Sequence, residues 1–153
     1  MQLADLITED HVFAGVRIAD KPALLAELAR RAAGALGLPA ADVASRLAAR
    51  EALGSTGVGA GIAVPHARID GLAAPVGFFA RLDRAIDYAA IDGKPVDLVF
   101  LLLSPADGAA PGNSQHLAAL AAVSRRLRDA GASASLRAAK SSVALRAILI
   151  GAA

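Results

Sequence analysis

The sequence predicts an α/β fold in a single domain, and three observations support this prediction. Segment 96–103 is apolar at almost every position, which is typical of a strand that is buried on both faces of its sheet. Segment 24–36 repeats apolar residues at every fourth position, as the buried face of a helix does. The whole chain, residues 1–153, is long enough to bury a full core without metals or cross-links. Helices are therefore expected to cover both faces of one sheet.

The N-terminal third of the chain predicts short strand pieces followed by two helices. The strand pieces lie within segment 12–18. Asp20 is a good N-cap for the first helix, Pro22 fits its first turn, and Gly37 can end it. The second helix is expected over 39–54, with its last turn next to a glycine-rich stretch.

The middle of the chain predicts strands separated by turns. Besides 96–103, segments 62–64 and 76–82 have the apolar content of strands, and 86–88 can add a short one. Asp92, followed by glycine, marks a turn before the long buried strand.

After the long strand, segment 106–112 contains Asp-Gly and Pro-Gly pairs and is expected to be a loop. Asn113 or Ser114 can cap the next helix, whose inward positions include His116 in its first turn. Two shorter helices are expected in the C-terminal tail. No internal repeat or linker divides the chain.

The most unusual stretch is 54–68, where four glycines fall within eight residues. Glycine lacks a Cβ, so it permits positive φ angles and a close approach of other groups to the backbone. Pro65 donates no ladder hydrogen bond and is expected to end the strand before it. The next residue, His66, would then lie at the rim of the sheet, which suits a group that handles a phosphate or a proton.

Several kinds of chemistry are disfavoured by the composition and by missing motifs. The chain has no cysteine, which excludes disulfides, thiolate nucleophiles and cysteine-based metal sites. Three scattered histidines without carboxylates at ligand spacing are poor evidence for a metal. The glycines lack both the lysine of a P-loop and the spacing of a dinucleotide-binding fingerprint. No Gly-x-Ser-x-Gly motif supports a serine hydrolase.

Nucleic acids and membranes are not expected as partners. The formal net charge is only +2, and the chain has no basic stripe with interleaved aromatic residues. The apolar run 98–103 is far shorter than the roughly 20 residues that cross a bilayer. The N-terminus does not resemble a signal peptide. These features predict a cytoplasmic protein without membrane insertion.

Histidine as a nucleophile is the active chemistry that remains. Neutral imidazole can attack phosphorus and hold the phosphoryl group covalently. A glycine loop, the hydroxyls of Ser55 and Thr56, a nearby Arg50 and a second histidine are suited to positioning that group. The alternative is a structural glycine turn beside a buried histidine, with Arg50 complementing the end of its helix and His116 packed in the core.

The residues of this stretch also carry a resemblance to a known family. Arg50, Glu51, the four glycines and the run Ile-Ala-Val-Pro-His that ends at His66 resemble the signature of fructose/mannitol-type EIIA domains. These domains belong to the phosphoenolpyruvate-dependent phosphotransferase system (PTS), and the sequence is most similar to their nitrogen-regulatory branch, EIIA-Ntr. Further similarity lies in segments 91–98, 105–107 and 116–120, so the resemblance spans nearly the whole chain.

The resemblance implies an α/β fold with a mixed sheet of about five strands between helices. It implies that His66 accepts a phosphoryl group, through Nε2, from a phosphohistidine on a small HPr-like carrier. His116 and Arg50 would stabilise the phosphate, and no metal or cofactor is implied. The loop positions that match the family's phosphate-binding loop are Ser55, Thr56 and Gly57.

The role expected from this resemblance is that of a free-standing regulatory phosphocarrier. Its downstream partner could be an EIIB, a sensor kinase or a transporter. One alternative is a sugar-transport EIIA that passes phosphate to a fructose or mannitol EIIB, and another is an interaction module without onward transfer.

The sequence departs from the family pattern in two places. Ala67 and Arg68 follow the histidine where many relatives carry glycine and then lysine or threonine, which is expected to alter the surface that partners meet. The loop over 106–115 is also expected to be long.

Overall fold

The computed structural model describes residues 2–106 and 110–151. Eleven regular elements and two short 3₁₀ turns, Leu3–Asp5 and Glu9–His11, make up this part of the chain. The strands are β1 Val12–Val16, β2 Gly57–Gly59, β3 Ile62–Ala63, β4 His66–Ile69, β5 Val76–Ile86 and β6 Val96–Pro105. The helices are α1 Lys21–Leu36, α2 Ala40–Ala52, α3 Ala110–Arg128, α4 Ala130–Ala138 and α5 Ser142–Ile150.

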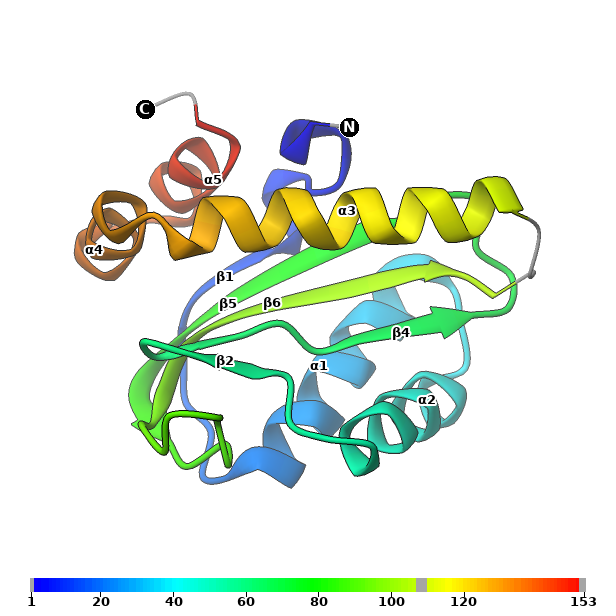
Figure 1. Ribbon diagram of the computed structural model, residues 1–153, viewed down its shortest axis with the longest axis horizontal. Helices are drawn as coiled ribbons and strands as arrows, with labels where there is room; N and C mark the ends of the chain where they lie inside the picture. The colour runs from blue at the N-terminus through cyan, green and yellow to red at the C-terminus, as the bar shows by residue number, and fades with distance from the viewer. Residues whose placement is uncertain (1, 107–109, 152–153) are drawn as a thin grey trace.

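The strands form one mixed sheet with β6 near its centre, as Figure 1 shows. On one side of β6, β5 pairs antiparallel, and β1 pairs parallel to β5. On the other side, β3 and β4 both pair parallel to β6, one after the other along its length. β2 adds to β3 as an antiparallel neighbour. The expected mixed sheet is confirmed, with six strands that occupy five positions across it.

Helices cover both faces of the sheet, as the apolar strand predicted. α1 and α2 lie against one face, and α3 crosses the other with α4 and α5 at its C-terminal end (Figure 1). Alternate residues of β6 enter the two cores: Leu101 and Leu103 face α1 and α2, whereas Phe100 and Leu102 face α3. No helix in the described part of the chain is long and apolar enough to span a bilayer.

The predicted limits of the first helix are confirmed by its caps. The Asp20 carboxylate accepts a hydrogen bond from the Ala23 N–H at 2.9 Å, and Pro22 lies in the first turn. Gly37 ends the helix with φ 68°, a left-handed conformation that glycine adopts without steric cost.

Three local predictions are corrected by the structure. The sequence predicts His66 at the rim of the sheet after Pro65 and no strand there, whereas His66 begins a further strand, β4, and pairs with Leu102 of β6. Segment 86–88 is no separate strand, since Ile86 is the last residue of β5. The helix expected to begin at Asn113 or Ser114 begins at Ala110, which shortens the predicted 106–112 and 106–115 loops. Positions 107–109 of those loops lie outside the described residues.

Candidate active site

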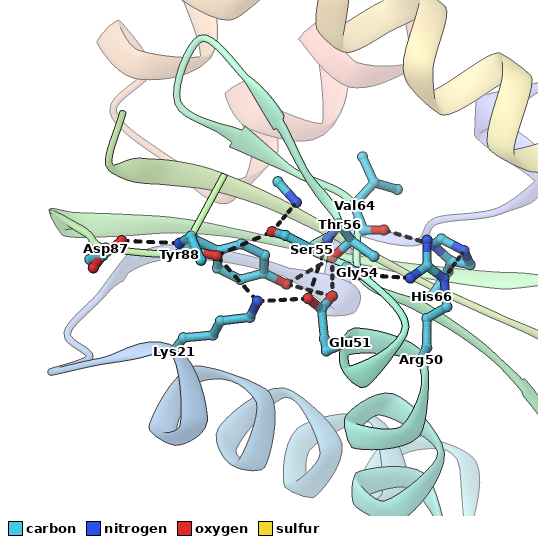
Figure 2. A network of polar contacts seen from close by, with 12 residues as sticks. Lys21, Arg50, Glu51, Gly54, Ser55, Thr56, Val64, His66, Asp87 and Tyr88 are labelled. Atoms are coloured by element: carbon cyan, nitrogen blue, oxygen red, sulfur yellow. Dashed lines mark hydrogen bonds and ion pairs between the residues drawn. The ribbon is translucent and has the colours of Figure 1, made fainter. Parts of the chain in front are cut away.

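The imidazole of His66 is held by one hydrogen bond at each ring nitrogen. Its Nδ1 lies 2.9 Å from the carbonyl oxygen of Val64, and its Nε2 lies 3.1 Å from Nε of Arg50 (Figure 2). A carbonyl oxygen can only accept a hydrogen bond, so Nδ1 carries the proton and is the donor. The guanidinium can only donate, so Nε2 accepts with its lone pair. Both contacts therefore assign the same neutral tautomer, with Nε2 as the basic nitrogen.

Arg50 reaches His66 from the last turn of α2. Its Nη1 donates to the carbonyl oxygen of Gly54 at 2.9 Å, while its Nε donates to His66. Among the described strands, β4 pairs only with β6, so its other edge is open to α2. The guanidinium is thus fixed at two points, and its position at the helix C-terminus is favourable for a cation.

His116 faces His66 from α3, with 5.6 Å between the ring centroids. It is only 8% exposed, and its Nδ1 lies 2.6 Å from Oγ of the fully buried Ser104. Ser104 is paired with Arg68 in the register of β6 and β4, two residues beyond the pair of Leu102 and His66. The predicted pair of histidines is therefore brought together by three elements: β4, β6 and α3.

The two histidines line a hollow of about 340 Å³ that is open to solvent. Two further arginines contribute to its wall, Arg46 one turn before Arg50 on α2 and Arg68 two residues after His66 on β4. Nε of Arg68 donates to the carbonyl oxygen of Pro105 at 2.9 Å. Ala49, Leu53 and Ala67 also line the hollow. The lining residues within 2–106 and 110–151 are thus cationic or neutral.

The surroundings keep both histidines neutral near pH 7. Burial lowers the pKa of His66 below its ordinary value, and the charge of Arg50 lowers it further, although the Val64 hydrogen bond and Glu51 oppose this. Burial also lowers the pKa of His116, to about 4, with smaller contributions from the charges of His66 and Arg68. A neutral His66 retains the Nε2 lone pair that a nucleophile requires.

The predicted phosphate loop packs against a second group of polar residues rather than around the hollow. Oγ of Ser55 donates to the carbonyl oxygen of Tyr88 and accepts from the N–H of Gly57. Thr56 is 4% exposed, and its hydroxyl donates to Glu51. None of Ser55, Thr56 and Gly57 is among the residues that line the hollow. Their role in binding phosphate stays a prediction.

Sequence reasoning gave no role to the carboxylate that organises this loop. Glu51 accepts from the backbone N–H of Thr56 at 3.2 Å and from the hydroxyl of Tyr88 at 3.1 Å, and it forms an ion pair with Lys21 at 2.8 Å. Burial acts to raise the pKa of Glu51, but the bonds from Lys21 and Thr56 outweigh it, and the pKa is lowered. The sequence signal was present, because Glu51 directly follows Arg50 and Tyr88 is the chain's single tyrosine.

The described residues contain no cluster of three or more histidine, aspartate or glutamate side chains that could hold a metal ion. What the hollow offers is a basic imidazole nitrogen, a second neutral imidazole and guanidinium groups. Such groups can receive a dianionic phosphoryl group and stabilise its charge without a metal.

This mixed sheet, with two histidines facing each other at its edge, makes an α/β protein of the kind that the sequence resemblance to EIIA domains implies. The chain belongs to the family described as phosphoenolpyruvate-dependent sugar phosphotransferase system, EIIA 2, whose family model matches residues 5–151.

Two relatives point to the nitrogen-regulatory branch of this family. A nitrogen regulatory protein of Bradyrhizobium diazoefficiens is 42% identical over 149 residues, which cover 97% of this chain and 95% of that protein. The crystal structure of nitrogen regulatory protein IIA-Ntr from Neisseria meningitidis superposes with a TM-score of 0.87 at 34% identity, covering 96% of this chain and 98% of that one. Mannitol IIA of Escherichia coli shares the fold, with a TM-score of 0.77 at 17% identity over 93% of this chain and 97% of that one.

Proposed function

We propose that this protein is a histidine phosphocarrier of the PTS and that His66 accepts the phosphoryl group on Nε2. The observation that carries the proposal is the pair of hydrogen bonds on its ring, because they leave the lone pair on Nε2 at the hollow. The donor is a phosphohistidine on an HPr-like carrier. Membership in the EIIA family supports this assignment.

The transfer requires only groups that surround the hollow and the donor. The Nε2 lone pair attacks phosphorus, while the bond from phosphorus to the donor nitrogen breaks and leaves its electron pair on the donor ring. Nδ1 keeps its proton throughout and donates a hydrogen bond to the carbonyl oxygen of Val64. This hydrogen bond stabilises the positive charge that develops on the His66 ring. Arg50 exchanges its contact with Nε2 for the oxygens of the incoming group.

His116 acts as a neutral hydrogen-bond donor in this proposal. If the hydroxyl of Ser104 donates to Nδ1, the proton of His116 is on Nε2, where it can bind a phosphoryl oxygen. The pKa of about 4 keeps the ring neutral, so its contribution is a hydrogen bond rather than a charge.

A phosphorylation assay tests the assignment of His66. Incubation with phosphoenolpyruvate, enzyme I and an HPr-like carrier is expected to give an acid-labile adduct on the wild-type chain and none on His66→Ala. His116→Ala is expected to slow the transfer by roughly 10²–10³-fold without eliminating it.

His11→Gln is the matched control for this assay. His11 stacks on Phe78 and lies within 3.2 Å of the carbonyl oxygen of Gly77, and it is not among the residues that line the hollow. Its substitution is expected to leave the adduct intact. An adduct that survives His66→Ala would overturn the site assignment.

The similarity to nitrogen regulatory proteins favours a regulatory role over sugar transport. A complex of mannitol IIA with phosphorylated IIB is known from Escherichia coli, which keeps transfer to an EIIB as the second candidate. The two are separated by mixing the phosphorylated chain with a purified EIIB. Rapid loss of phosphate to the EIIB indicates a transport role, whereas a stable phosphorylated chain that binds a sensor kinase or transporter indicates regulation.

A further inference from the structure

The buried carboxylate of Glu51 is connected to the reactive histidine by an unbroken chain of hydrogen bonds. Glu51 accepts from the N–H of Thr56. The carbonyl oxygen of Thr56 accepts from the N–H of Val64 at 3.0 Å. The carbonyl oxygen of Val64 in turn accepts from Nδ1 of His66 at 2.9 Å. Through Thr56 and Val64, Glu51 thereby fixes the position of the carbonyl oxygen that accepts the hydrogen bond of His66.

A second connection runs from the same helical turn to the other ring nitrogen. The carbonyl oxygen of Glu51 accepts from the N–H of Gly54 at 3.1 Å, and the carbonyl oxygen of Gly54 receives Nη1 of Arg50. Arg50 then donates its Nε to Nε2 of His66. Both hydrogen bonds of the imidazole therefore depend on the segment that Glu51 ties down.

The carboxylate is itself firmly held. Its side chain is 7% exposed, with Lys21 as its ion-pair partner and the hydroxyls of Thr56 and Tyr88 as donors (Figure 2). A buried charge with this many partners costs less to bury than an unpaired one and resists rearrangement. The Lys21 ammonium also lies over the Tyr88 ring, 4.3 Å from its centroid. Through these contacts Glu51 connects Lys21 of α1 to Thr56 of the glycine loop.

We propose that Glu51 is a positioning residue that fixes the tautomer of His66. Free histidine prefers to carry its proton on Nε2, and in that form Nε2 has no lone pair with which to attack phosphorus. The Val64 carbonyl reverses this preference only while Thr56 and Val64 keep their places, and Glu51 secures Thr56. The effect of Glu51 on the His66 tautomer is independent of the proposed function. Only the expected effect on the transfer rate rests on that function.

The test reads the His66 tautomer directly in the unphosphorylated protein. In ¹⁵N-labelled wild-type chain at neutral pH, NMR is expected to show a protonated Nδ1 and an unprotonated Nε2. In Glu51→Gln both tautomers are expected, because the amide cannot accept at all the positions of the carboxylate or pair with Lys21. The initial phosphorylation rate is expected to fall in proportion to the reactive fraction, by about twofold where the two tautomers are equally populated.

Matched variants separate positioning from a general loss of structure. Glu27→Gln also removes an ion-paired carboxylate, one that Arg30 and Arg31 hold on the surface of α1, and it is expected to behave as wild type. Tyr88→Phe leaves the hydrogen bond that the Thr56 N–H donates to Glu51 in place and is expected to keep the wild-type tautomer. If Glu51→Gln does not fold, Glu51→Asp withdraws the carboxylate from Thr56 and is expected to show both tautomers.

A folded Glu51→Gln, or in its place a folded Glu51→Asp, that keeps the pure wild-type tautomer would overturn the inference. Because this readout needs no phosphoryl donor, its result does not depend on whether the phosphorylation assay succeeds. A failed transfer with a fixed tautomer would contradict the proposed function instead.

Discussion

His66 and His116 lie among cationic side chains, which add to the effect of burial in keeping both rings neutral. Arg46, Arg50 and Arg68 line the same hollow, and the residues of the described ranges that line it include no carboxylate. Protonation of either imidazole would add a positive charge to this group, whereas a phosphoryl group would neutralise it. The hollow therefore favours neutral histidines when it is empty and an anion when it is filled.

The low pKa of His116 predicts a pH-dependent loss of stability. The unfolded chain binds a proton at His116 below about pH 6.5, whereas the folded chain binds it only below about pH 4. Between these values the unfolded state holds more protons, so the free energy of unfolding falls as the pH falls. The contribution of His116 to this loss is up to roughly 3 kcal/mol by pH 4.

Urea unfolding of wild-type chain and His116→Asn at several pH values tests this prediction. At pH 7 the wild-type chain is expected to be the more stable, and the difference is expected to shrink as the pH falls from 6.5 to 4. Two curves that stay parallel over this interval would show that His116 titrates normally in the folded protein.

At the level of elements, local signals predicted helices well and strand pairing less well. Asp20 and Gly37 mark the limits of α1 because capping depends on a few adjacent residues. β4 was missed because Pro65 is a local sign that a strand ends, whereas the pairing of 66–69 with 102–105 is decided by contacts distant in the sequence. Pro111 indicated a loop, yet it fits the first turn of α3, where N–H groups need no partner within the helix.

In the candidate site, too, some features could be predicted from the sequence, whereas contacts between residues distant in the sequence could not. His66, Arg50 and His116 were predicted to act together, and the structure brings them to one hollow. The hydroxyl of Thr56 instead bonds with Glu51 and lies 2.9 Å from that of Tyr88, 32 residues further along the chain. Glycine spacing carries no information about such a distant partner.

Two glycines predict opposite effects of one substitution. Gly57 lies in β2, where an added Cβ would lie 2.7 Å from Cβ and 2.9 Å from Cα of Ala90. Gly57→Ala is therefore expected to destabilise the protein by about 1–3 kcal/mol, since backbone must move. Gly34 is exposed in α1 with nothing within 4 Å, so Gly34→Ala is expected to stabilise by about 0.5–1 kcal/mol through helix propensity.

Thermal unfolding followed by circular dichroism measures both effects on the same scale. Gly34→Ala serves as the control, because it adds the same methyl group without a contact. Equal midpoints for the two variants would contradict the tight packing of β2 against Ala90.

At the scale of the whole molecule, β6 joins the two hydrophobic cores. Each of its residues from Leu98 to Leu103 is fully buried, and successive residues enter opposite cores. β6 therefore contributes side chains both to the core under α1 and α2 and to the core under α3, α4 and α5. Loss of packing on one face shifts the strand that the other face packs against, which favours unfolding in one step.

Substitutions on the two faces of β6 are accordingly expected to have the same global effect. Leu101→Ala and Leu102→Ala each open a cavity in a different core and are expected to cost roughly 2–5 kcal/mol of unfolding free energy. Leu117→Ala is the control, since Leu117 is 58% exposed, and its cost is expected to stay below about 0.5 kcal/mol.

Two probes show whether the cores unfold together. Fluorescence of Tyr88, which is fully buried in the core under α1 and α2, reports on one face, and the chain has no tryptophan to obscure it. Far-ultraviolet circular dichroism reports on all helices, including α3, α4 and α5. In both leucine variants the two signals are expected to change at the same denaturant concentration, because β6 cannot leave one core without leaving the other. If Leu102→Ala lowers the midpoint seen by circular dichroism and leaves that of Tyr88 unchanged, the two cores unfold independently.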